Sequence, residues 1–245
     1  AEAMIGRALN AGHQIILIRP ILIIREKASH FLGRALKKYP RNSFYLATKL
    51  PVWLVNSVED AERLFKEQLS RLQTKYIDYY LLHALDAGRW EKLVKEGIIE
   101  WAEAKKASGK IRHLGFSFHD TYPVFREILT YRQWDFCQIQ YNYIDTQVQA
   151  GDKGYELAAK MGVPMVIMEP VKGGRLANLP EEAKEALNEA DPDRSAASWA
   201  LRWVGSHENV KVILSGMSSM EQLEDNLETF GKFQPLTEAE EEAVE

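Results

Sequence analysis

The sequence predicts an α/β fold in which a parallel sheet is covered by helices. Apolar runs of strand length alternate with amphipathic helical patterns through the chain, which is typical of this class. The runs are continuously apolar, as in parallel strands buried on both faces. No strand is followed by G-x-G-x-x-G, which disfavours an open dinucleotide-binding sheet. The 245 residues are close to the roughly 250 of an eight-stranded α/β barrel, the architecture we expect.

The first elements follow from local patterns. A helix opens the chain and Gly12 stops it, so the sequence is expected to start inside an element. Residues 13–29 are unusual, because six isoleucines fall between positions 15 and 24 without polar alternation. A helix then runs to Pro40, and the strand over 44–49 follows. Ser57 and Asp60 have capping-box spacing and begin a helix that leads to the strand over 76–83.

The same helix-then-strand step repeats to the end of the chain. The predicted pairs are listed in chain order: helix 90–107 with strand 111–117, helix 122–131 with strand 136–140, helix 154–161 with strand 164–169, and helix 194–204 with strand 210–214. An insertion with Pro180 and Pro192 precedes the last pair, and a helix capped by Ser218 or Ser219 follows it. We expect one barrel domain over 1–245, truncated at both ends, with its first strand missing and its second disrupted.

Composition narrows the classes of function. The formal charge of −4 and the pI near 6.0, with scattered Lys and Arg, argue against nucleic-acid and polybasic membrane partners and favour a small-molecule substrate. The single cysteine, Cys137, cannot form an internal disulfide or a cysteine metal cage, so we expect a reducing cytoplasm and no metal site. The apolar stretch over 15–24 is too short to span a bilayer.

Polar side chains stand at the ends of six predicted strands: Lys49, His83, Ser117, Gln138, Glu169 and Ser215. In a parallel barrel these ends share one rim, which is where barrel enzymes carry their chemistry. A lysine at a strand end is more often a surface cation, and a lone histidine is more often a core residue, so position alone is weak support.

Five short strings at these strand ends resemble the aldo-keto reductase family. They are Leu-Ala-Thr-Lys ending at Lys49, Ile-Asp-Tyr-Tyr-Leu-Leu-His ending at His83, Gly-Phe-Ser ending at Ser117, Gln-Ile-Gln-Tyr-Asn beginning at Gln138, and Met-Glu-Pro around Glu169. Their order is the family's order. The likeness is greatest to a bacterial branch that often carries a C-terminal four-cysteine iron-sulphur extension, and the present sequence stops before such an extension. The resemblance implies a barrel that moves a hydride between a nicotinamide nucleotide and a carbonyl or alcohol.

The resemblance also implies roles. Lys49 would lower the pKa of a catalytic tyrosine that donates the proton, and His83 would orient the substrate carbonyl. Ser117 and Gln138 would hold the nicotinamide carboxamide, although Phe118 stands where the family often has Asn. The remaining cofactor candidates are Glu169, Gly173, Gly174, Ser215, Gly216 and Asn226. We expect NADP(H) rather than NAD(H), although Ser215 and Gln222 stand where many NADPH-preferring members have a basic residue.

The family's aspartate and tyrosine have no counterpart in residues 13–29. Read one base out of frame, however, the codons allowed from Gln14 onward can spell Asn-Tyr-Phe-Asp-Thr-Ala-Tyr, and those before Ser29 can spell Lys-Gly-Lys-Ser-Glu. Both strings belong to the family. We hypothesise that residues 14–29 are an out-of-frame reading of that motif; otherwise they form a real buried strand broken by Pro20.

Two other functions remain open. A barrel lysine can form a Schiff base, as in aldolases, which would give Lys49 another role. A catalytically dead barrel could still bind nucleotide and act as a sensor or subunit. The sequence does not define the substrate or the oligomeric state.

Overall fold

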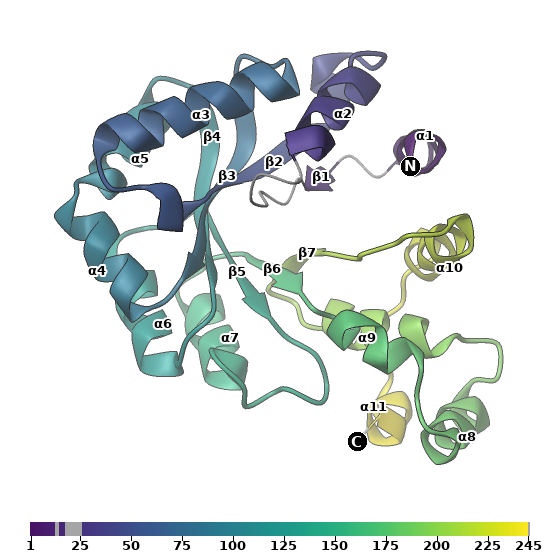
Figure 1. The fold of residues 1–245 in the computed structure, drawn as a ribbon. Helices are drawn as coiled ribbons and strands as arrows, with labels where there is room; N and C mark the ends of the chain where they lie inside the picture. The colour runs from purple at the N-terminus through teal and green to yellow at the C-terminus, as the bar shows by residue number, and fades with distance from the viewer. Residues whose placement is uncertain (13–14, 18–25, 245) are drawn as a thin grey trace. The chain divides into compact units, whose positions relative to one another are not determined.

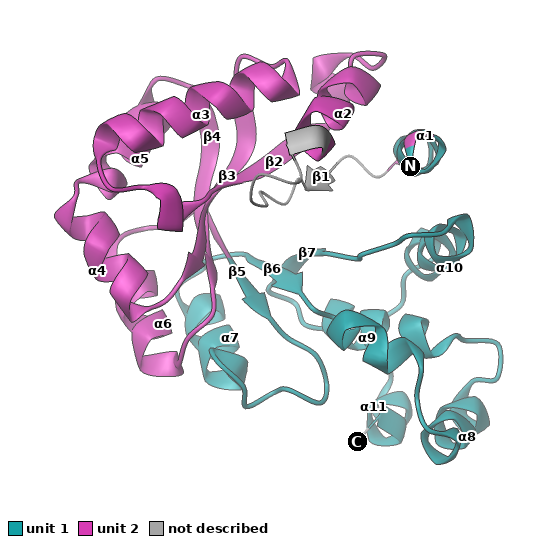
Figure 2. Cartoon of the chain, in the orientation of Figure 1, with its two compact units in different colours: residues 1, 3–11, 138–245 teal, residues 2, 12–137 magenta. Residues whose placement is uncertain are grey.

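The computed structural model describes residues 1–12, 15–17 and 26–244, and parallel strands alternate with helices along this chain (Figure 1). The described residues form two compact units (Figure 2). Unit 1 holds residues 1, 3–11 and 138–245, and unit 2 holds residues 2 and 12–137. The predicted α/β class is confirmed.

Unit 2 contains parallel strands that pair in chain order. They are β1 (Ile15–Leu17), β2 (Tyr45–Leu50), β3 (Ile77–Leu85) and β4 (Ile111–Phe118). The strand β5 (Phe136–Gln140) begins in this unit and ends in unit 1. Its start lies so close to β4 that a Cβ at Gly115 would stand 2.5 Å from the main-chain oxygen of Phe136. Glycine is therefore required at that position.

The helices of unit 2 follow the strands. They are α2 (Glu26–Leu36), α3 (Val58–Leu72), α4 (Ala87–Lys95), α5 (Ile98–Ala107) and α6 (Tyr122–Tyr131), with short 3-10 turns η2 (Arg41–Ser43) and η3 (Val52–Leu54). The Ser57 side chain caps α3 by accepting from Asp60 N, as its spacing predicts. The single helix predicted over 90–107 is wrong. Gly97 adopts φ 69° and divides it into α4 and α5.

A buried carboxylate links β2 and β3 near the amino-terminal ends of these strands. Asp78 is 1% exposed, and its Oδ2 accepts from Leu46 N at 2.8 Å and from Arg41 Nη2 at 2.5 Å. Its Oδ1 accepts from Arg112 Nη1 at 3.0 Å. Buried charges need such partners, so Asp78 binds backbone and guanidinium groups as a structural residue.

Unit 1 contains the parallel pair β6 (Met165–Met168) and β7 (Val210–Ile213). Its helices are α1 (Glu2–Asn10), α7 (Gly151–Lys160), α8 (Glu181–Ala190), α9 (Ala196–Gly205), α10 (Met220–Gly231) and α11 (Glu238–Val244), with the 3-10 segment η4 (Lys172–Ala177). Sequence analysis missed α8, which lies between Pro180 and Pro192. Its Glu- and Ala-rich sequence favours a helix and could have revealed it.

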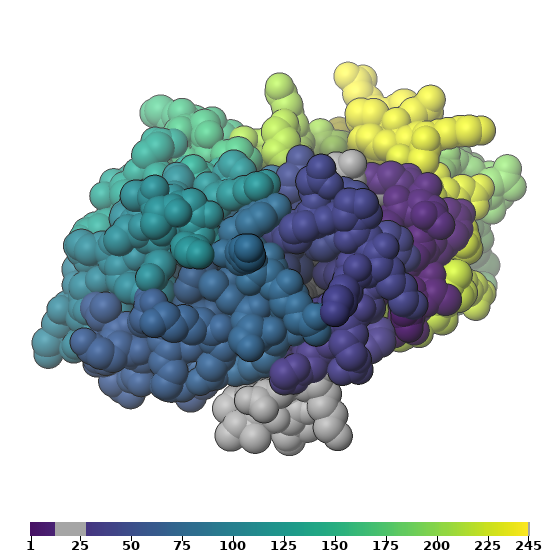
Figure 3. Space-filling model, turned by 90° about the horizontal axis from the view of Figure 1, so that it is seen from above, coloured from purple at the N-terminus to yellow at the C-terminus, as the bar shows by residue number. Residues whose placement is uncertain are grey.

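The first helix packs within unit 1 although the rest of that unit comes from the C-terminal half. Arg7 on α1 forms an ion pair with Glu224 on α10 at 2.7 Å. In the space-filling view, α1 in deep purple lies beside atoms of the yellow C-terminal part (Figure 3). The apolar residues Met4, Ile5, Ala8 and Leu9 of α1 are half-buried.

The frame hypothesis concerns a stretch that lies mostly outside the described residues. Of residues 14–29, the structure describes only 15–17 and 26–29. Ile15, Ile16 and Leu17 pair with Tyr45, Leu46 and Ala47 of β2, so this position holds a short strand. That pairing is compatible with both hypotheses, an out-of-frame reading of the family motif and a real buried strand. Within the part of the chain that the structure describes, no helix has the length and apolar character needed to cross a membrane.

Candidate active site

Three of the predicted residues lie at the carboxyl ends of neighbouring strands in unit 2. Lys49 on β2 pairs with Leu81 on β3, and Leu81 pairs with Gly115 on β4. His83 and Ser117 stand two residues beyond Leu81 and Gly115. Because side chains two apart along a regular strand point to the same face, Lys49 and Ser117 share a face, and His83 lies beside them where the register between β3 and β4 shifts.

Lys49 is held in a buried position. The residue is 4% exposed, and its main-chain oxygen accepts from Gln68 Nε2 at 2.8 Å. Gln68 lies on α3, and its Oε1 accepts from the Tyr80 hydroxyl at 2.9 Å. Burial raises the pKa of Tyr80 well above its ordinary value, so this hydroxyl stays a neutral donor. Sequence analysis missed Gln68, which its position on the apolar stripe of α3 could have suggested.

His83 lies beside an aromatic side chain from the turn after β2. Its imidazole centre is 5.0 Å from the ring centre of Trp53 in η3, at a tilt of 53°. Ser117 is fully buried, and its Oγ accepts from the backbone N–H of Ala84 at 2.8 Å. A serine hydroxyl that accepts one bond can still donate its own proton. Ser117 therefore both touches the residue after His83 and retains a donor for a ligand.

The loop after β4 has a structural explanation. Asp120 Oδ2 accepts from Ala87 N at 2.9 Å, and its Oδ1 accepts from Thr121 N at 2.7 Å. His119 N donates to Leu85 O at 2.9 Å. These bonds hold the backbone of the loop that follows β4. Cys137 is buried, and burial raises the pKa of its thiol, so it is a core residue.

In unit 1, Gln138 lies in the middle of β5 rather than at the strand end where the sequence predicts it, and Glu169 directly follows β6. Gln138 is 1% exposed, and its Nε2 donates to the Met168 sulphur at 3.0 Å. Glu169 has φ 57°, and its main-chain oxygen accepts from Asn142 Nδ2 at 3.2 Å. Asn142 is fully buried, and its Oδ1 also accepts from the N–H groups of Ile144 and Asp145. Asn142 thus organises the turn after β5. It stands in one of the family strings, but sequence analysis assigned it no role.

The segment after Glu169 contains two glycines, Gly173 and Gly174, with space around the positions that a Cβ would take. Lys172, Gly173 and Gly174 have φ of 48°, 63° and 94°. Among the described atoms, a Cβ on Gly173 would meet only a carboxylate oxygen of Glu169, at 3.7 Å, and one on Gly174 would meet none within 4 Å. Lys172 Nζ donates to Asp145 Oδ1 at 2.5 Å, which holds the pKa of Asp145 below its usual value. This glycine pair leaves room for a ligand to approach the backbone.

The remaining candidates form a second small cluster in unit 1. Asn226 Nδ2 donates to Ser215 Oγ at 2.7 Å, so two residues predicted to share a ligand are in contact. A Cβ on Gly216 would also meet no described atom within 4 Å. Ser219 and Gln222 form a capping box at the start of α10, which commits the Gln222 side chain to the helix end. At this helix start the N–H groups of Ser218 and Ser219 donate to Gln222 Oε1, at 2.7 Å and 3.3 Å.

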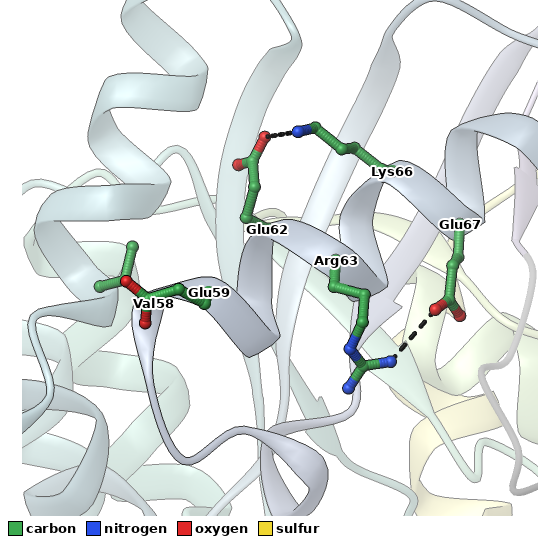
Figure 4. Close-up of a pocket in the computed structure, with 6 residues that line it drawn as sticks. All are labelled: Val58, Glu59, Glu62, Arg63, Lys66 and Glu67. Atoms are coloured by element: carbon green, nitrogen blue, oxygen red, sulfur yellow. Dashed lines mark hydrogen bonds and ion pairs between the residues drawn. The ribbon is translucent and has the colours of Figure 1, made fainter.

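The hollow shown in Figure 4 has a different character. It is an open depression of about 640 Å³, and α3 alone provides its lining: Val58, Glu59, Glu62, Arg63, Lys66 and Glu67. Glu62 pairs with Lys66 at 3.3 Å and Arg63 with Glu67 at 3.1 Å, each four residues apart. Such pairs are typical of a solvated helix face, so we assign it no chemistry. In the described ranges, no group of three His, Cys, Asp or Glu side chains could hold a metal ion.

Comparison with known proteins identifies the class. The aldo/keto reductase family model matches residues 1–245, so the chain belongs to the aldo/keto reductase family. The chain is similar to the aldo-keto reductase AKR11C1 from Bacillus halodurans in its holo form, with 27% identity and a TM-score of 0.84. That match covers 99% of this chain and 85% of the other. The predicted family resemblance is confirmed.

The chain is also similar to curated proteins. The chain is 28% identical over 163 residues to an uncharacterized oxidoreductase of Schizosaccharomyces pombe, covering 66% of this chain and 50% of that protein. It is 25% identical over 240 residues to the NADH-specific methylglyoxal reductase of Escherichia coli, covering 80% of this chain and 72% of that protein. The chain thus spans half the length of the first relative and about three quarters of the second.

Proposed function

We propose that this protein is an NAD(P)H-dependent reductase of small carbonyl compounds and that its fold is a (β/α)8 barrel. The observation that carries the proposal is that Lys49, His83 and Ser117 lie at the carboxyl ends of the neighbouring strands β2, β3 and β4. A cation, an imidazole and a hydroxyl at this edge are the groups that carbonyl reduction needs. Membership of the family supports the reaction class.

Each residue has a defined task in this proposal. A reduced nicotinamide nucleotide supplies the hydride. Lys49, as an ammonium, favours the phenolate of a tyrosine and so makes that tyrosine a better proton donor near neutral pH. The His83 imidazole hydrogen-bonds the substrate oxygen and fixes its direction, and Ser117 binds the carboxamide of the nicotinamide.

Within unit 1, taken by itself, a second group of residues is assigned to nucleotide binding. Gly173 and Gly174 give the pyrophosphate access to the backbone, with Glu169 lining the turn. Ser215, Gly216 and Asn226 bind the adenosine. The holo form of the Bacillus halodurans neighbour supports a bound cofactor. We propose NADP(H) as the first choice and NAD(H) as the alternative, since one relative is named NADH-specific.

The proton donor depends on residues 14–29. We propose that the native protein carries the family's Asp and Tyr there, with the Asp codon across Leu17 and Ile18 and the Tyr codon across Pro20 and Ile21. Sequencing the gene, together with peptide mass spectrometry of the native protein, tests this directly. An isoleucine-rich peptide spanning these positions would exclude it.

The activity test compares the chain as written with a version in which the shifted frame is restored. Oxidation of NADPH and NADH is followed with methylglyoxal and other small aldehydes. We expect turnover from the restored chain, and a loss of about 10²–10⁴ in kcat/KM when Lys49 is replaced by Met or His83 by Gln. A restored chain that neither binds nucleotide nor turns over any aldehyde would refute the proposal.

A second function deserves a test because residues 13–29, as written, contain neither Tyr nor Asp. In that case the protein would be an inactive nucleotide-binding barrel, acting as a sensor or subunit. Quenching of tryptophan fluorescence by NADPH without turnover, in a protein whose gene encodes the isoleucines, would support it. Borohydride trapping of a carbonyl compound on Lys49 would instead support Schiff-base chemistry.

A further inference from the structure

The residue after His83 has an unusual backbone conformation. Ala84 has φ 55°, which lies in the left-handed region. For a residue with a Cβ this region costs roughly 1–2 kcal/mol, so surrounding groups must hold it. The register between β3 and β4 also shifts between Leu82 and Leu85. The chain therefore changes direction directly after His83.

Two side chains bind both backbone groups of Ala84. Its N–H donates to Ser117 Oγ at 2.8 Å, from β4. Its C=O accepts from Arg89 Nη1 at 2.6 Å, from α4. A backbone held at both its donor and its acceptor has little freedom to return to negative φ. Ser117 and Arg89 together form what we call the Ala84 clamp.

The arginine of the clamp is itself fixed in place. Arg89 Nη1 lies 3.2 Å from Asp86 Oδ2, and the other oxygen of Asp86 accepts from Arg89 N at 2.8 Å and caps α4. On the far side of Ala84, Leu85 O accepts from His119 N at 2.9 Å. The segment after His83 is thus bound from both β4 and α4. A charge-assisted bond such as that from Arg89 is stronger than a neutral one.

We propose that Arg89 and Ser117 are positioning residues for His83: by holding Ala84 in the left-handed conformation, they fix the direction of the His83 imidazole. The inference rests on the proposed function, in which His83 orients the substrate carbonyl. It adds Arg89, a partly exposed residue outside the family strings, to the residues on which the reaction depends. Without the clamp, Ala84 would relax to negative φ and turn the imidazole away from Trp53.

The test uses the ring contact between His83 and Trp53 as its reporter. Trp53 lies 5.0 Å from the imidazole, so its ring current shifts the Cε1–H signal of His83 in a ¹³C–¹H NMR spectrum. The variant His83→Asn assigns that signal. The test variants are Arg89→Met, Ser117→Ala and the double variant Arg89→Met with Ala84→Gly.

The control is Arg63→Met. Arg63 pairs with Asp60 three residues away at 3.2 Å, the same spacing and distance as Arg89 with Asp86. We expect Arg89→Met and Ser117→Ala to shift the His83 signal and Arg63→Met to leave it unchanged. Glycine adopts positive φ without a clamp, so Ala84→Gly in the Arg89→Met background should return the signal toward that of the parent protein.

Two outcomes would overturn the inference. One is a His83 signal that is the same in Arg89→Met, Ser117→Ala and Arg63→Met. The other is a shifted signal that Ala84→Gly fails to restore, since the backbone of Ala84 would then not be the connection. The measurement needs no turnover and no cofactor, so failure of the proposed function would show separately in the activity assay.

Discussion

Replacing Gln68 with leucine is expected to lower the free energy of unfolding by about 2–4 kcal/mol. The Gln68 side chain bridges the Lys49 main-chain oxygen at 2.8 Å and the Tyr80 hydroxyl at 2.9 Å. Lys49 is 4% exposed and Tyr80 is fully buried, so water cannot replace the lost bonds. A buried polar group left without a partner costs about 1–3 kcal/mol, and the leucine recovers part of the loss of two.

Urea unfolding followed by tryptophan fluorescence measures this loss of stability. The variant Tyr80→Phe measures the part that comes from the bond between Tyr80 and Gln68. Tyr80→Phe leaves only Gln68 Oε1 without its donor, so its expected cost is about 1–2 kcal/mol. In the double variant both ends of that bond are absent, and the combined loss should fall below the sum of the two by about 1 kcal/mol. Lys66→Met, at an exposed ion pair on the same helix, is the control and should change stability by less than about 0.5 kcal/mol.

Two results would refute this reasoning. A Gln68→Leu variant as stable as the Lys66→Met control would show that the bridge contributes nothing. Strict additivity of Gln68→Leu and Tyr80→Phe would show that the two side chains do not interact in solution.

Other predictions concern buried charges and the thiol. Asp78→Asn should lower the free energy of unfolding by about 3 kcal/mol, because it leaves guanidinium groups without their carboxylate. Arg112→Met, at the half-exposed partner, should lower it by under about 1 kcal/mol, and urea unfolding compares the two variants. The Arg202 guanidinium lowers the pKa of Glu240 from 4.5 to about 2, so this carboxylate stabilises the fold above pH 4.5 and loses its effect as pH falls toward 2. The stability difference between the parent and Glu240→Gln should therefore shrink over that range in acid titrations. Cys137 should react with a thiol reagent only as fast as the protein unfolds, and rapid labelling of the folded protein would contradict its burial.

Much of the fold could be predicted because its signals are local. Helices such as α6, over Tyr122–Tyr131, and α10, with its Ser219 cap, follow from periodicity and capping within one segment. The break between α4 and α5 was missed because the apolar pattern continues across it. Only the left-handed backbone of Gly97 divides the two helices. No helix was predicted at α8, because prolines flank this segment and proline is typical of loops.

The sequence by itself determined the alternation of strands and helices, the family, and the identity of the residues at the strand ends. These depend on side-chain type and short-range spacing, which a single chain displays directly. The tertiary structure decided that β2, β3 and β4 are neighbours, which brings the strand ends with Lys49, His83 and Ser117 together, because register is set by pairing between distant segments. It also decided that Gln68 and Arg89 bind the backbone of Lys49 and Ala84. Such bonds depend on where a helix packs and on a single φ angle, and neither leaves a periodic pattern in the sequence.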